Sequence, residues 1–139
     1  MSNNRFVLDG WEALRAELRN LPPSMVDEAS GIVADAARNS ESDIRAAYEA
    51  HIKAGELSAD LTTVIQKGGR AFAGAIVRNT SKLAYIFENG TQVRHSASGA
   101  SRGSIKPLHV AIPTFIKRRA EMYERLRAMM AAHGLTVIG

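Results

Sequence analysis

The chain has 139 residues and a mass of 15.0 kDa, the size of one domain, so a second full domain is excluded and residues 1–139 are expected to fold together. Hydrophobic residues make up 45% and charged residues 23%, which predicts a folded core. The absence of cysteine excludes disulfides, a thiolate nucleophile and a cysteine-type zinc site, and favours a reducing compartment. The net charge of +4 is unevenly distributed. Residues 1–53 carry six Lys or Arg against nine Asp or Glu, whereas residues 94–139 carry eight against two.

The amino terminus, MSNNRFVLDGW, has no basic segment followed by an apolar run, so no export signal is expected. No apolar stretch approaches the roughly 20 residues that span a bilayer. The sequence therefore predicts a soluble protein with no membrane partner.

Two helical regions are expected in the first half of the chain. Residues 6–21 carry apolar side chains at spacings of three and four, which predicts an amphipathic helix: Val7, Trp11, Leu14, Leu18 and Leu21. Pro22 and Pro23 should stop it, and Ser24 should cap a second helix over 24–53. Short polar side chains over 39–42 predict a break or bend there, and Gly55 should follow the helix end.

The middle of the chain predicts strands. β-Branched residues are frequent over 57–65, and a turn at 67–70 separates this stretch from the mainly apolar stretch 71–77, so two antiparallel strands are expected. Residues 81–91 permit two interpretations. Either Thr80 or Ser81 caps a short helix that Gly90 ends, which we favour, or Asn89-Gly90 is the turn of a hairpin.

The last third combines a loop and a helix. Residues 92–106 are small and polar, with too little apolar surface to offset ordering entropy, so a flexible loop is expected. Pro107 closes the loop, a helix is expected from Pro113 to Gly134, and residues 135–138 are expected to add a strand to the sheet. The predicted fold class is α+β: a small antiparallel or mixed sheet of about 3–4 strands packed against a long N-terminal helical region and a C-terminal helix.

The sequence offers little catalytic chemistry. The four histidines lack the spacing of a helical metal clamp, and neither a phosphate loop nor a nucleophile elbow is present: His51, His95, His109 and His133. Glu88 stands alone in an apolar neighbourhood, where a carboxylate is more often a cap or an ion-pair partner than a general acid. We therefore expect no enzyme, no cofactor and no metal.

A basic surface is the remaining candidate for binding. Lys117, Arg118 and Arg119 follow one another on the predicted C-terminal helix, and the preceding loop adds further cations: Arg94, Arg102 and Lys106. Such a surface could contact nucleic acid or an acidic protein. The favoured interpretation for the helix is a solvated face in which Glu121 and Glu124 pair with Arg125, Arg127 or Lys117.

Three stretches in this order resemble the small tail-completion or head-tail joining proteins of long-tailed, siphovirus-type bacteriophages. They are an amphipathic helix ending at Leu21-Pro22, the segment 55–61 (GELSADL) and the segment 84–91 (AYIFENGT). The family motif falls on residues spread over most of the chain: Gly55, Leu57, Leu61, Tyr85, Glu88, Gly90, Thr91 and Pro107. Leu108 and His109 stand where the family usually has an aromatic residue, and Asn89 replaces a commonly apolar one.

The resemblance implies a structural virion protein made in the bacterial cytoplasm. By this resemblance, copies would form a ring of six at the head-proximal end of the tail. The ring would contact connector or stopper proteins and the tail tube or terminator protein, close to the passing DNA. A tail terminator of the same junction is the alternative in this class. From another class, the alternative is a small nucleic-acid-binding protein that uses the basic C-terminal helix. A further hypothesis is that loop 92–106 orders on assembly against a neighbouring subunit or the head-side ring.

Overall fold

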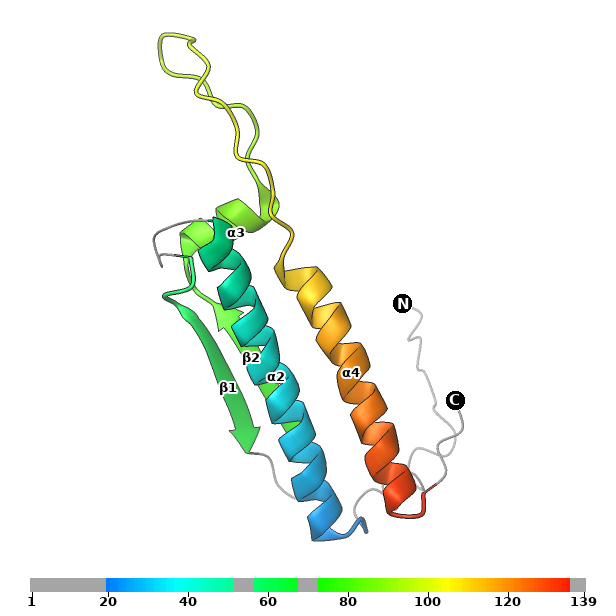
Figure 1. Cartoon of the computed structure of the whole chain (residues 1–139). Coiled ribbons are helices and arrows are strands. Elements are labelled where there is room, and N and C mark those ends of the chain that lie inside the picture. Colours follow the sequence, from blue (N-terminus) through cyan, green and yellow to red (C-terminus); the bar gives the residue numbers. More distant parts are fainter. Residues whose placement is uncertain (1–19, 52–56, 68–72, 136–139) are drawn as a thin grey trace, which may run out of the picture.

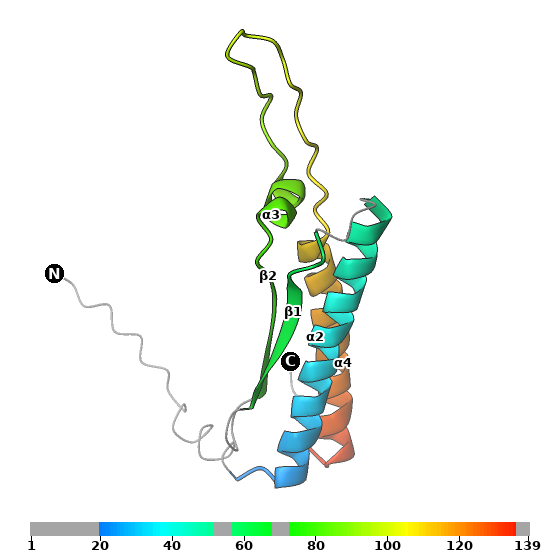
Figure 2. The ribbon, with the colours of Figure 1, turned by 90° about the vertical axis from the view of Figure 1, so that its left-hand side faces the viewer.

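The computed structural model describes residues 20–51, 57–67 and 73–135, which form an α+β arrangement of five elements. In chain order these are α2 (Pro23–His51), β1 (Leu61–Lys67), β2 (Ala73–Asn79), α3 (Lys82–Asn89) and α4 (Ala111–Ala132). The two long helices, α2 and α4, lie side by side, and the β1–β2 hairpin packs on another side of α2 (Figures 1 and 2). No helix in these ranges is long and apolar enough to cross a membrane.

Helix α2 begins one residue earlier than predicted. Pro23 occupies the first helical position, where its missing amide has no consequence, and the amides of Met25 and Val26 donate to the Pro22 carbonyl. The turn and bend at Asn20 and Leu21 mean that the helix predicted over 6–21 does not reach its expected end, and its remaining residues lie outside the described ones.

The predicted break at residues 39–42 is wrong, because α2 runs on without interruption. The Ser40 side chain is buried, and its hydroxyl donates to the Ala36 carbonyl over 2.8 Å. A serine that satisfies its hydroxyl within its own helix does not need to leave helical geometry. Gly55, expected to follow the helix end, lies outside the described residues.

The sheet has two strands within the described residues, not the 3–4 predicted. Strands β1 and β2 are antiparallel and pair Leu61 with Asn79 at one end and Lys67 with Ala73 at the other. The first strand starts later than predicted, because residues 57–60 form a turn in which the Leu61 amide donates to the Ser58 carbonyl. Arg45 of α2 donates to the carbonyls of Ser58 and Leu61, which ties this turn to the helix.

Helix α3 confirms the favoured helical interpretation of residues 81–91. Ser81 is its N-cap, since its hydroxyl accepts the Ala84 amide at 3.4 Å. Gly90 follows the last turn with a φ of 72°, and its amide donates to the Ile86 carbonyl. The Asn89-Gly90 hairpin is therefore not formed.

Helix α4 starts at Ala111, two residues before the predicted start at Pro113. It ends as predicted at Gly134, whose φ is 78°, and the amides of Gly134 and Leu135 donate back to the carbonyls of Ala131 and Met130. Leu135 joins no strand, and residues 136–138 of the predicted terminal strand lie outside the described ones.

Two apolar clusters hold these elements together. The first joins α2, the turn before β1, the strand and α3, through Ile44, Tyr48, Leu57, Leu61 and Ala84. The second joins the start of α2 to the end of α4, through Met25, Ile32 and Met129. Leu21 packs against the second cluster and so lies close to the start of α2 and the end of α4.

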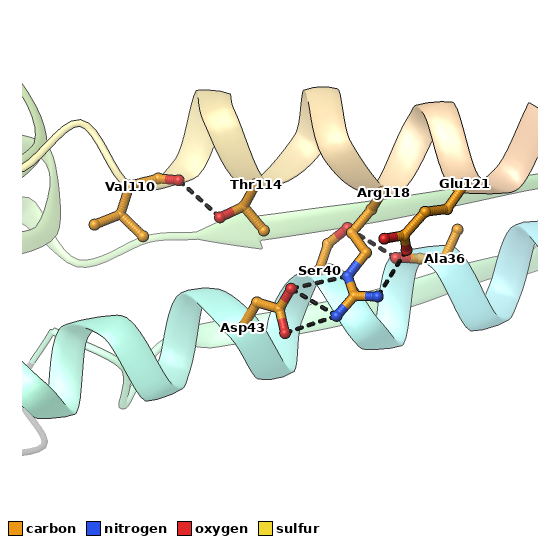
Figure 3. A network of polar contacts seen from close by, with 7 residues as sticks. All are labelled: Ala36, Ser40, Asp43, Val110, Thr114, Arg118 and Glu121. Carbon is orange, nitrogen blue, oxygen red and sulfur yellow. Dashed lines mark hydrogen bonds and ion pairs between the residues drawn. The ribbon is translucent and has the colours of Figure 1, made fainter.

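Ion pairs also join α2 to α4, and they use part of the charge asymmetry noted above. Acidic residues of α2 pair with basic residues of α4 at two levels, Asp43 with Arg118 and Asp35 with Arg125, and a third contact joins Glu28 to the ring of His133, the residue after α4. The Arg118 guanidinium binds both Asp43 oxygens and also Glu121 (Figure 3). The rising residue numbers on one helix and falling numbers on the other show that α2 and α4 are antiparallel.

Candidate interaction site

The Glu88 carboxylate joins three parts of the fold. It accepts the Tyr48 hydroxyl of α2 at 2.8 Å, and it accepts the backbone amides of Val110 and Ala111 at 3.1–3.2 Å. Val110 provides no side-chain cap of its own, so Glu88 supplies the acceptor that the first turn of α4 lacks. A negative group at this end also interacts favourably with the helix dipole.

Tyr48 is almost fully buried, with 3% of its surface exposed. Burial of its hydroxyl and, next, the hydrogen bond to Glu88 raise the pKa of Tyr48 well above its ordinary value. The tyrosine therefore stays a neutral donor to Glu88 across the usual pH range.

Gly90 lies where the chain crosses itself. A Cβ added to Gly90 would come within 2.7 Å of the Ile105 carbonyl oxygen and 2.9 Å of Pro107. Beside this crossing, the Thr91 amide donates to the Ile105 carbonyl, and the Ile105 amide donates to the Thr91 hydroxyl. The crossing and the positive φ of Gly90 each require glycine here.

Residues 91–107, which we call the arm, leave and re-enter the body through this crossing. The arm contains no helix or named strand, but its two legs are paired: the amides of Arg94 and Arg102 donate to the carbonyls of Gly103 and Arg94, and His95 and Ser101 form an isolated bridge. At a rise of about 3.3 Å per residue, each leg of the arm extends about 20 Å from the body. Both views show the arm standing clear of the helices and sheet (Figures 1 and 2).

The arm presents positive charge to solvent. Arg94, Arg102 and Lys106 are exposed, and no acidic residue occurs between Glu88 and Glu121. Within the described part of the chain, no hydrogen bond or ion pair connects residues 92–104 to the body. These side chains are therefore available to a partner.

The basic residues of α4 do not form the continuous patch suggested by their order in the sequence. Arg118 turns toward α2, where Asp43 and Glu121 bind it (Figure 3). Lys117 and Arg119 are exposed, but two residues apart on a helix they point about 160° from each other. Of the predicted pairs, Glu124 with Arg127 is present.

The other motif residues have structural positions. Leu57 and Leu61 are in the first apolar cluster, with 1% and 4% of their surfaces exposed. Tyr85 is 73% exposed on α3 and does not contribute to the core. Gly55 lies outside the described residues, so the structure brings together four of the motif residues, at the base of the arm: Glu88, Gly90, Thr91 and Pro107.

Within residues 20–51, 57–67 and 73–135, no three metal-ligating side chains gather. Among the histidines, His133 pairs with Glu28, and His95 contacts the Gly99 carbonyl within the arm. Comparisons with protein-family models, curated proteins and solved structures found no match.

Sequence reasoning placed Glu88 in an apolar setting with a cap as its most common role, but it did not identify the partners. Tyr48 is 40 positions away in the sequence, and the capped helix starts 22 positions later. One signal was present: the start of α4 has no Ser, Thr, Asp or Asn at its first residues, so a distant acceptor was needed.

Replacing Glu88 with alanine should lower the free energy of unfolding by about 2–4 kcal/mol, because it leaves a buried hydroxyl and two helix amides without an acceptor. Urea unfolding of the isolated chain measures this. Glu124→Ala, at a site with a 73% exposed side chain, is the matched control and should change stability by less than about 0.5 kcal/mol. Equal effects of the two substitutions would contradict the role assigned to Glu88.

Two glycines with similar positive φ angles, Gly90 and Gly99, should respond differently to alanine. Gly90→Ala should destabilise the fold by about 3 kcal/mol or more, since it combines a positive φ with a clash at the crossing. Gly99 has a φ of 83° with open space around it, and Gly99→Ala at the arm tip should cost at most about 2 kcal/mol. Thermal unfolding followed by circular dichroism compares them, and an equal loss would show that the crossing is not tight.

Tyr48 should make stability depend on alkaline pH. Its folded pKa lies above the unfolded value of about 10, so above pH ~10 the unfolded chain loses a proton that the folded chain keeps. Stability contributed by Tyr48 is complete below pH ~10 and falls by about 1.4 kcal/mol per pH unit above it. The difference between the wild type and Tyr48→Phe in urea unfolding, measured from pH 8 to pH 11, isolates this effect; a constant difference would refute it.

Proposed function

We propose that this chain is a structural assembly protein of a long-tailed bacteriophage, forming a ring, hexameric in the family it resembles, at the head-proximal end of the tail. The observation that carries the proposal is the arm: a paired, cationic extension whose residues 92–104 make no hydrogen bond or ion pair to the described body, held at its base by a half-buried carboxylate and a tight crossing. An extension of this form suits contact with another molecule.

The motif residues support the same proposal. Glu88, Gly90, Thr91 and Pro107, on which the resemblance chiefly depends, all serve to start and orient the arm. In the proposed ring, the arm contacts a neighbouring subunit, the connector or stopper proteins, or the tail proteins. The chain would be part of the virion neck, assembled in the host cytoplasm, and it would have no catalytic role.

The exposed surface suits an assembly subunit as well. Large apolar side chains face solvent on both strands and on α4, including Val64, Ile76, Ile112, Ile116 and Tyr123. Both edges of the two-stranded sheet are open within the described residues. Open strand edges and apolar surface are features by which copies associate. A tail terminator at the same junction would use the same features.

Shortening the arm tests the proposal in infected cells. Deleting residues 96–101 leaves His95 and Arg102 as a two-residue turn between Arg94 and Gly103, whose backbones are already hydrogen bonded, so the isolated chain should keep its melting temperature. Filled heads and free tails should then accumulate unjoined, as counted by electron microscopy, because the partner contact is lost. Gly99→Ala, which changes the arm tip without shortening it, should still give joined particles.

Two results would refute the proposal. One is a normal yield of infectious particles with the shortened arm. The other is absence of the chain from purified virions, in which about six copies at the neck are expected. Titration of the monomer with duplex DNA at two salt concentrations tests the alternative class, a nucleic-acid-binding protein. Tight binding that weakens strongly with salt would favour that class, provided that a variant carrying both Arg94→Glu and Arg102→Glu loses it.

A further inference from the structure

The two arginines of the arm lie opposite each other on one face of its paired legs. His95 and Ser101 form the isolated bridge between the legs. Side chains alternate between the two faces along a strand, so the neighbouring residues Arg94 and Arg102 share the face opposite to that bridge. The Arg102 amide donates to the Arg94 carbonyl over 2.6 Å, which pairs the two arginines directly. Side chains in such a pair start about 5 Å apart.

A bulge beside this pair keeps other large side chains away from it. The Arg94 carbonyl accepts the Arg102 amide, whereas the Arg94 amide donates to the Gly103 carbonyl, so two residues of one leg oppose one residue of the other. This is the arrangement of a β-bulge, and its extra residue, Gly103, has a φ of 72° and no side chain. Toward the tip, the same face carries only the small side chains of Ser96 and Ala100. A partner can therefore reach both guanidinium groups.

The arginine pair is unfavourable in the isolated chain. Two like charges directly opposite each other on paired strands repel and lower stability. Both Arg94 and Arg102 are exposed, and among the residues that the structure describes neither has an ion-pair partner that would offset this repulsion. An anion held between the two guanidinium groups would remove the repulsion and be bound by both. The arm thus carries the charge arrangement of a preformed anion-binding site.

The small number of cations favours carboxylates over the phosphates of nucleic acid as the anion. Tight binding to the backbone of duplex DNA rests on about 6–10 phosphate contacts, whereas the arm carries three cations, Arg94, Arg102 and Lys106. The C-terminal helix does not extend this surface with Arg118, because Asp43 binds that side chain. A planar guanidinium binds one carboxylate through two parallel hydrogen bonds, so two arginines are enough for a pair of carboxylates.

A second copy of this chain is a poor source of those carboxylates. Its arm carries no acidic residue, and two cationic arms repel each other. Most acidic side chains on the described surface of the body are already paired within the chain: Glu28, Asp35, Glu41, Asp43, Glu121 and Glu124. Asp27, Glu49 and Asp60 have no ion pair there, but Asp27 and Glu49 are about six helical turns apart on α2. Adjacent exposed carboxylates are therefore better supplied by another protein.

We propose that Arg94 and Arg102 form a clamp for two neighbouring carboxylates on the surface of a different protein of the virion neck. The inference rests on the function proposed above and narrows its partners from subunits of the same ring to an acidic connector, stopper or tail protein. Each guanidinium takes one carboxylate, while the crossing at Gly90 holds the base of the arm.

Co-sedimentation of the purified chain with filled heads, or with tails, made without this chain tests the clamp. The wild type should sediment with one of the two. Binding should weaken by at least about tenfold in a variant with both Arg94→Glu and Arg102→Glu, because like charges then face each other, while its melting temperature is unchanged. The matched control, Arg38→Glu with Arg127→Glu, alters the net charge equally at exposed positions of α2 and α4 and should bind as the wild type does.

Selection of suppressors identifies the partner. Phage carrying Arg94→Glu and Arg102→Glu should regain a normal yield through substitutions of Asp or Glu by Lys or Arg in the gene of another neck protein, because the reversed charges then attract again. Sequencing of the revertants reads this out.

Four results would overturn the inference. Equal binding of the charge-reversed variant and the wild type would remove the clamp and leave the proposed function in place. Loss of wild-type binding after DNase treatment of the particles would make DNA phosphate the anion. Suppressors confined to acidic positions of this chain would make a second copy the partner. Absence of wild-type binding to both heads and tails would refute the proposed function as well.

Discussion

The fold depends on one half-buried carboxylate. The Glu88 carboxylate accepts hydrogen bonds from the Tyr48 hydroxyl and from the amides of Val110 and Ala111 at the start of α4, so a single side chain of α3 contacts both long helices. A buried donor without an acceptor is costly, so these hydrogen bonds favour the observed relative position of the three helices. The α2–α4 ion pairs and the Met25–Met129 cluster then determine how the two helices lie along their lengths.

The same carboxylate sets the direction of the arm. Glu88 lies two residues before Gly90, and Val110 lies three residues after Pro107, so the groups that Glu88 joins flank the crossing on both sides. The arm therefore starts from a well-supported part of the molecule, although its residues 92–104 make no hydrogen bond or ion pair to the described body. Because the base of this cationic arm is already ordered, binding a partner would cost little conformational entropy at the base.

Local patterns predicted the elements better than their connections. The caps Ser81 and Gly134 and the apolar spacing of α4 were sufficient to place α3 and most of α4, because those signals act within one turn. The break at 39–42 was predicted wrongly because the sequence does not show that Ser40 bonds back to Ala36. The number of strands could not be predicted, since a short apolar stretch such as 135–138 carries no information on its partner.

The sequence pointed to the residues of the candidate site but not to the contacts that join them. Glu88, Gly90, Thr91 and Pro107 were singled out by resemblance. Their physical link is the crossing, in which Gly90 and Thr91 contact Ile105 and Pro107, about 15 positions later in the chain. The structure also shows where part of the uneven charge is used. Asp35 and Asp43 pair with Arg125 and Arg118 of the same chain, which leaves the arm as the clearer source of unpaired positive charge.

The crossing at Gly90 also separates two kinds of sequence constraint. On the body side of the crossing, residues are limited by packing, by the Glu88 acceptor or by the space beside Ile105 and Pro107. Beyond the crossing, the legs of the arm hydrogen bond to each other and not to the described body, so residues can be added or removed in facing pairs while the body stays the same. The reach and charge of the arm can thus evolve, or be redesigned, independently of the fold that carries it.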